Sequence, residues 1–152
     1  MNTKSDKISA KAKEFFDKIE VSGDLSCEEK DDYFYLNLRV DEPAGLIGYH
    51  GQTLEALQLI LNLILTKYLG EYTKVVLDIS DWRKRREETI KEMAQKTAIK
   101  AKFSGEPQIL SGLKAFERRI IHMILADHPD VTTESEGEGE ERVIKILPKK
   151  KD

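Results

Sequence analysis

The feature that most constrains the fold is a glycine-rich turn set between a predicted strand and a long apolar helix. Residues 33–41 alternate polar and apolar side chains, a pattern that predicts a strand with one buried face. Pro43 cannot donate a ladder hydrogen bond, so the strand must end before it. Three glycines then follow within seven residues: Gly45, Gly48 and Gly51. A helical pattern begins directly after them, so residues 33–70 are predicted to fold as strand, glycine loop and helix.

The helix after the glycine loop is predicted to be deeply packed, because its apolar side chains lie nearly all round it. These side chains are Leu54, Leu57, Ile60, Leu61, Ile64 and Leu65. Gly70 is well suited to end the helix. The apolar run 54–65 is too short to cross a bilayer and is interrupted by three polar residues, so no membrane insertion is predicted.

The flanking segments complete a first α+β module. A helix is predicted over residues 6–19, and strands are predicted over 20–27, 33–41 and 72–80. The polar residues 28–32 are predicted to join the first two strands. The order helix, strand, strand, glycine loop with helix, strand is complete by Ser80, so a first domain is predicted over residues 6–80.

A second α+β module is predicted over residues 81–148. Helices are predicted over residues 81–103 and 113–126, and strands over 108–110, 131–135 and 141–147. The sequence Gly105-Glu106-Pro107 stops the first of these helices. The predicted fold class is therefore α+β, with two small modules in tandem.

The distribution of charge favours a confined basic surface on an acidic protein. The formal net charge is −3, yet residues 1–80 carry 9 basic and 14 acidic side chains, and residues 82–122 carry 11 basic and 5 acidic ones. A single cysteine, Cys27, cannot form an internal disulfide, and residues 1–10 contain no apolar signal-peptide core. These features predict a protein of the reducing cytoplasm.

The glycine loop has chemistry suited to a nucleic-acid backbone. Glycines let the main chain approach a sugar-phosphate strand closely, and the start of the following helix offers N–H donors to phosphate. Two glycines in a strand-to-helix turn can also be purely steric. The surrounding pattern Leu46-Ile47-Gly48-x-x-Gly51-x-x-Leu54, between a strand and a helix, resembles the KH domain, in its bacterial type II form. The resemblance implies that Gly48, Tyr49, His50 and Gly51 contact RNA.

Two groups of basic residues follow in the second module. Arg83, Lys84, Arg85 and Arg86 stand at the start of a predicted helix, where the helix dipole disfavours cations. Phosphate contact would explain them, and so would a solvated face of ion pairs with the nearby glutamates. The sequence leaves both interpretations open, and Arg83 and Arg86 are taken as candidate RNA contacts.

The predicted helix 113–126 carries a second basic group. Its apolar stripe is predicted at Leu113, Phe116, Ile120, Met123 and Ile124. Lys114, Arg118 and His122 recur every four residues on another face. An arginine and a histidine four residues apart, on a helix followed by a hairpin, resemble the Arg-xxx-His domain. That resemblance implies that Arg118 and His122 contact single-stranded nucleic acid, with Arg119 as a third contact.

The two modules in this order are similar to the Jag (KhpB) family of bacterial RNA-binding proteins. The resemblance implies a single-stranded RNA-binding protein, with single-stranded DNA as an alternative ligand, linked to cell elongation and division and acting with a small single-KH partner protein. Members often carry a further N-terminal domain, so this sequence is expected to be a short homologue or part of a longer protein. The predicted RNA contacts are Gly48, Tyr49, His50, Gly51, Arg83, Arg86, Lys114, Arg118, Arg119 and His122.

Other functional classes have weaker support in the sequence. No Walker A or dinucleotide-binding glycine motif is present, and no histidine and cysteine spacing suits zinc, so no cofactor or metal is predicted. An enzyme would have to use His50, His122 or His128 as an acid or base, and no enzyme is predicted. The alternative is a protein-interaction module that uses the glycine loop or the strand 33–40 to join another KH protein.

Overall fold

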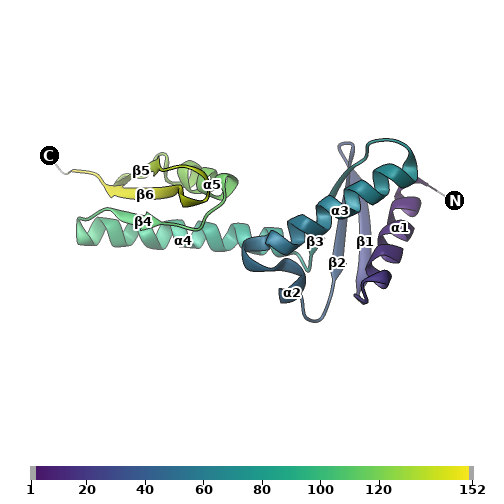
Figure 1. Ribbon diagram of the computed structural model, residues 1–152. Coiled ribbons are helices and arrows are strands. Elements are labelled where there is room, and N and C mark those ends of the chain that lie inside the picture. Colours follow the sequence, from purple (N-terminus) through teal and green to yellow (C-terminus); the bar gives the residue numbers. More distant parts are fainter. Residues whose placement is uncertain (1–2, 151–152) are drawn as a thin grey trace. The chain divides into compact units, whose positions relative to one another are not determined.

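The computed structural model describes residues 3–150 and divides into two compact units, one ending at Arg83 and the other beginning at Lys84 (Figure 1). Both units combine helices with a small three-stranded sheet, which confirms the predicted α+β class. No helix within residues 3–150 is both long and apolar enough to cross a membrane.

The first unit contains a mixed sheet in the order β1-β2-β3. Its elements are α1 (Lys4–Lys18), β1 (Asp24–Lys30), β2 (Tyr33–Arg39), α2 (Ala44–Ile47), a 3₁₀ turn η1 (Tyr49–Gly51), α3 (Gln52–Leu69) and β3 (Lys74–Ile79). Strands β1 and β2 are antiparallel, whereas β2 and β3 are parallel. A parallel pair needs a crossover connection, and the glycine loop with α3 supplies it.

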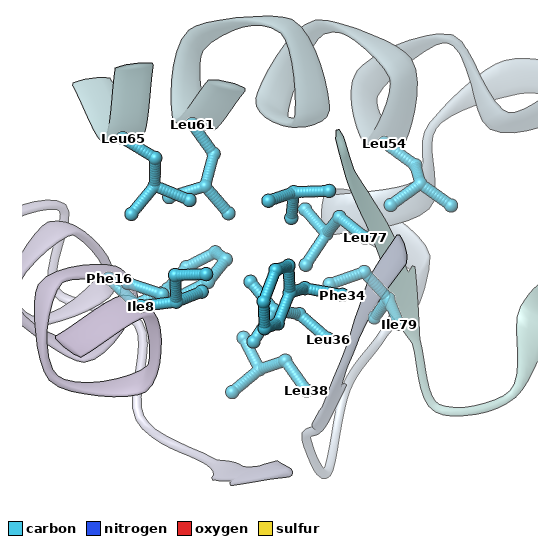
Figure 2. Close-up of a cluster of buried hydrophobic side chains, with 12 residues drawn as sticks. Ile8, Phe16, Phe34, Leu36, Leu38, Leu54, Leu61, Leu65, Leu77 and Ile79 are labelled. Carbon is cyan, nitrogen blue, oxygen red and sulfur yellow. The ribbon is translucent and has the colours of Figure 1, made fainter. Parts of the chain in front are cut away.

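The core of the first unit lies between the sheet and the helices α1 and α3. Figure 2 shows the side chains of both helices pointing toward those of the strands. The buried members are Ile8, Ala12, Phe16, Phe34, Leu36, Leu38, Leu54, Leu61, Leu65, Val75, Leu77 and Ile79. Strand β2 alternates as predicted, because its buried side chains are interleaved with the exposed Tyr33 and Tyr35.

The prediction that the helix after the glycine loop is deeply packed is wrong. Only one stripe of α3 is buried, while Leu59 is 62% exposed, Leu63 is 64% exposed and Ile60 is exposed as well. A helix laid on one face of a sheet buries the side that meets the sheet, and the opposite side remains open whatever its residues are. Leu59, Ile60 and Leu63 are called the α3 apolar patch below.

The first predicted strand is shifted along the chain. It was expected over residues 20–27 with a polar connection at 28–32, but β1 spans Asp24–Lys30 and the turn consists of Asp31 and Asp32. Both turn residues have positive φ, 51° and 65°. Two residues of this conformation match the twist of a tight hairpin, so the turn needs no further residues. The charged residues before it therefore belong to β1 and pair with β2.

The second unit contains an antiparallel sheet in the order β4-β6-β5. Its elements are α4 (Trp82–Ser104, of which the first two residues belong to the first unit), β4 (Gln108–Leu110), α5 (Ala115–Leu125), β5 (Val131–Glu136), a 3₁₀ turn η2 (Gly139–Glu141) and β6 (Val143–Pro148). Its buried core combines Ile90, Ala94, Ala98, Ala101, Leu113, Ile121, Leu125, Val131, Ile144 and Ile146.

The predicted apolar stripe of α5 is wrong at Phe116 and Met123. These two side chains are 50% and 71% exposed, whereas Ile121 and Leu125 are buried together with Glu117. The buried face therefore runs along residues 117, 121 and 125. A glutamate in that row lowers its apparent hydrophobicity, so the neighbouring row at Phe116 and Met123 looked like the better core face.

Candidate nucleic-acid interface

The glycine loop of the first unit depends on Gly48. This residue has φ 73° and ψ −174°, a region that is essentially restricted to glycine. A Cβ added there would lie 2.1 Å from Oγ1 of Thr53, in the first turn of α3. The loop can therefore take this path only because position 48 has no side chain.

The two residues between the glycines form an aromatic surface. Tyr49 is exposed, and its ring stacks on the His50 ring with centroids 3.9 Å apart and planes 16° from parallel. His50 and Gly51 have positive φ, 52° and 79°, and Gly51 leads into α3. Among the described residues no side chain caps the start of α3, so the amides of its first turn can bind phosphate. The structure thus brings together the four predicted loop residues.

Arg83 is correctly placed at the start of a helix, but its guanidinium is bound internally. Its Nε donates to the carbonyl oxygen of Leu77 at 3.0 Å, and its Nη2 donates to that oxygen and to Oε1 of Gln58, both at 2.8 Å. These bonds tie the start of α4 to β3 and α3. Arg83 therefore has a structural role within the first unit, and its contact with RNA stays a prediction.

Arg86 also has an internal partner. Its Nε donates to Oε1 of Glu117 at 2.7 Å and its Nη2 donates to Oε2 at 3.3 Å, which is a two-point guanidinium–carboxylate pair. The Glu117 side chain is only 1% exposed. The pair joins α4 to α5 beneath the surface, which gives Arg86 a structural role, and its contact with RNA stays a prediction.

His122 is fixed by two hydroxyl groups of β5. Its Nδ1 lies 2.6 Å from Oγ1 of Thr133, and its Nε2 lies 2.7 Å from Oγ of Ser135. A hydroxyl can donate to an unprotonated ring nitrogen or accept from a protonated one, so both contacts suit either form of the ring. His122 therefore holds α5 against β5, and the surface it offers a ligand is its half-buried ring beside two hydroxyls.

The arginines of α5 lie beside this ring. Arg118 is half-buried, one turn before His122, and one of its guanidinium nitrogens donates to the carbonyl oxygen of Leu113. Arg119 is exposed. Lys114 occupies the N-cap position of the same helix, where its backbone N–H donates to the Glu117 carboxylate at 3.1 Å. Lys114, Arg118, Arg119 and His122 thus share one helix, and they are called the α5 basic surface below.

The sheet keeps acidic side chains away from the α5 basic surface. Strand β5 alternates, so Thr133 and Ser135 face α5 while Glu134 and Glu136 face the opposite side. Glu136 pairs there with Lys145 of β6, and this hydrogen-bonded ammonium holds the pKa of the Glu136 carboxyl below its usual range. Because Arg86 neutralises Glu117 and the β5 glutamates face away, the acids of α5 and β5 offset little of the positive charge of the surface.

The hydroxyl contacts to His122 give a first testable prediction. The double substitution Thr133→Val/Ser135→Ala leaves both ring nitrogens without their partners, and it is expected to lower the free energy of unfolding of the second unit by about 2 kcal/mol. Chemical denaturation followed by segment-resolved hydrogen exchange measures this loss. Thr132→Val is the matched control, since Thr132 is exposed, and it is expected to change little. Equal stability of the two variants would contradict the proposed role of the contacts.

Three residues of this region were not predicted from the sequence. Glu117, Thr133 and Ser135 support the α5 basic surface from below and from the side. The only sequence signal for the hydroxyls is the alternation Thr133-Glu134-Ser135-Glu136, which separates them from the acids. Within residues 3–150 no cluster of three or more His, Cys, Asp or Glu side chains could hold a metal ion.

A KH-type glycine loop followed by a helix of the Arg-xxx-His type defines the class of protein, and comparison with known proteins agrees. The family model described as KhpA/KhpB, KH domain, matches residues 5–79, and the model of the Arg-xxx-His domain matches residues 88–148.

Several curated relatives of the chain share one name. The chain is 35% identical over 150 residues to the RNA-binding protein KhpB of Clostridium symbiosum, covering 97% of this chain and 68% of the relative. It is 34% identical to that of Lactiplantibacillus plantarum and 33% identical to that of Bacillus subtilis, covering 88% and 84% of this chain but 41% and 62% of those relatives. The chain belongs to the KhpB family.

Proposed function

We propose that this protein binds single-stranded RNA, and that the α5 basic surface is its main contact. The observation that carries the proposal is the separation of charge in the second unit: Arg119 is exposed and Arg118 half-buried on α5, while Glu117 is buried and the β5 glutamates face away. Arginine binds phosphate through two parallel hydrogen bonds and can also stack on a base. Single strands expose both groups, which favours them over duplexes.

The glycine loop contributes a second contact in this proposal. Its backbone and the first-turn amides of α3 suit a sugar-phosphate strand, and the stacked rings of Tyr49 and His50 suit an unpaired base. Its electrostatic attraction is weak, because no lysine or arginine stands between the glycines and Glu55 lies in the first turn of α3. The loop is therefore expected to contribute less than the α5 basic surface.

The proposed surface is tested by removing its charge. Arg118→Gln/Arg119→Gln is expected to weaken binding of a mixed-sequence single-stranded RNA several-fold. It is also expected to reduce the slope of log affinity against log salt by about 0.7 for each phosphate that the protein no longer neutralises. Fluorescence anisotropy measures both. Lys96→Gln/Lys100→Gln removes the same charge from exposed positions of α4 and is the matched control. If the two double variants bind equally weakly, net charge and not this surface is responsible.

The cellular role and location in this proposal rest on membership of the family. We infer a cytoplasmic regulator that acts after transcription in cell elongation and division and does not catalyse a reaction. Competition between RNA and DNA strands of the same sequence measures which of the two ligands the protein prefers. We keep residues 6–80 and 81–148 as the proposed limits of the KH and Arg-xxx-His domains.

A second candidate function is association with a small single-KH protein through the α3 apolar patch. Leu59, Ile60 and Leu63 expose large aliphatic side chains on one helix, which is the usual mark of a protein-binding surface when such residues lie together. The alternative site predicted from the sequence, the strand 33–40, has no free edge, because β2 pairs with both β1 and β3. The α3 apolar patch is the better-supported surface.

The patch is tested by charging it. Leu59→Glu/Leu63→Glu is expected to abolish association with the small single-KH protein of the same organism, measured by sedimentation of the mixture, while leaving the fold unchanged. Ile99→Glu, at an exposed apolar position of α4, is the control. Association that survives in the double variant would remove this candidate.

A further inference from the structure

Two large side chains on α5 are exposed where a globular domain would normally bury them. Phe116 is 50% exposed and Met123 is 71% exposed, although Ile121 and Leu125 of the same helix are buried. They stand seven residues apart, and Arg119 lies between them, three residues after Phe116. Residues at these spacings share one face of a helix. Phe116, Arg119 and Met123 therefore form a continuous exposed stripe.

This stripe borders the α5 basic surface. Successive residues of a helix are turned by about 100°, so in this eleven-residue helix Arg118 lies on the side opposite Phe116, whereas Arg119 lies beside both Phe116 and Met123. The ring of His122 is held on the β5 side by Thr133 and Ser135. A strand with a phosphate at Arg119 would therefore have its neighbouring bases within reach of Phe116 and Met123.

Charge argues for a nucleic-acid occupant of the stripe. The charged residues of α5 are Glu117, Arg118 and Arg119, and the single acid is buried in its pair with Arg86. A protein partner would need acidic groups around an apolar centre, whereas a single strand carries phosphates and apolar base faces along its whole length. Aromatic rings, and flexible thioethers to a lesser degree, are suitable surfaces for stacked bases.

We propose that Phe116 and Met123 form a base-stacking platform, with Arg119 between them contacting the phosphate of the same nucleotide segment. This inference rests on the proposed RNA-binding function and deepens it, because it assigns the contact to base faces and not to base edges. The platform is tolerant of sequence, since every base has a face to stack. Phosphate attraction by the arginines and stacking on Phe116 then make separable contributions to affinity.

The two contributions are separated with a pair of single-stranded probes of equal length, one carrying bases and one abasic. For the base-carrying strand, Phe116→Ala/Met123→Ala is expected to weaken binding ~10-fold. For the abasic strand the same variant is expected to bind like the wild type, and the salt dependence is expected to be unchanged because no cation is removed. Alanine favours the helix at exposed positions, so the variant is expected to fold.

Two further variants sharpen the experiment. Phe116→Trp preserves a stacking ring and is expected to retain or improve the affinity for the base-carrying strand. Ile109→Ala removes an exposed apolar side chain from β4 and is expected to bind both strands like the wild type. Equal binding of the base-carrying strand by the wild type and Phe116→Ala/Met123→Ala would overturn the platform, as would an equal loss for both strands. Failure of the wild type to bind either strand would instead overturn the proposed RNA-binding function.

Discussion

Replacing Arg86 with methionine is expected to destabilise the second unit by about 3 kcal/mol, because it leaves the Glu117 carboxylate buried without its cation. Removing one member of a buried pair costs much more than the pair itself contributes, since the remaining charge has lost both its water and its partner. Hydrogen exchange resolved along the chain measures the effect and distinguishes the two units. Faster exchange is expected within residues 84–150.

The matched double substitution Arg86→Met/Glu117→Leu removes both charges. It is expected to recover part of the lost stability, because an apolar pair of similar size can replace a buried ion pair at little cost, whereas the Lys114 backbone N–H still loses its acceptor. Unchanged exchange in Arg86→Met would show that Glu117 is satisfied without Arg86. A double variant no more stable than Arg86→Met would contradict the explanation by an unpaired charge.

Substituting Gly48 with alanine is expected to destabilise the first unit by about 3 kcal/mol and to remove the contribution of the glycine loop to RNA binding. The backbone conformation at this residue is open to glycine alone, and the new Cβ would meet the Thr53 side chain and backbone. The loop must then move away from α3. Thermal denaturation together with RNA anisotropy measures the two effects.

Gly45 provides the control for this substitution within the same loop. It lies in α2, and a Cβ added there meets no atom within 4 Å. Gly45→Ala is expected to be neutral or to stabilise the fold by about 0.5 kcal/mol, because alanine favours a helix over glycine. If Gly45→Ala and Gly48→Ala behave alike, the specific requirement for glycine at position 48 is disproved.

The sequence predicted the structure best at positions where the residue type allows the backbone few conformations. Pro43, the closely spaced glycines and the alternation of residues 33–40 led to the correct order of strand, loop and helix, since each restricts the backbone directly. The resemblance to KH and Arg-xxx-His domains was also correct. Both results come from local features of the sequence: residues that restrict the backbone, a strict alternation, and two short motifs.

The errors concern helices on which several faces have similar hydrophobicity, because only tertiary packing determines which of these faces is buried. On α3 an apolar residue is present in every direction, so periodicity could not show that Leu59 and Leu63 are exposed. On α5 the burial of Glu117 was not predicted, because its partner Arg86 stands 31 positions earlier in the chain. The side-chain acceptors of Arg83 and Arg86 were not predicted either, because Gln58 and Glu117 stand 25 and 31 positions away in the chain.

The measurement that tests the central claim most directly is the affinity of the wild-type chain for a single-stranded RNA over a series of salt concentrations, followed by fluorescence anisotropy. Binding through Arg118, Arg119 and the neighbouring cations predicts a steep linear fall of log affinity with log salt, with a slope of about −0.7 for each phosphate contacted. An affinity that does not change with salt, or no binding at the lowest salt concentration, would contradict the account.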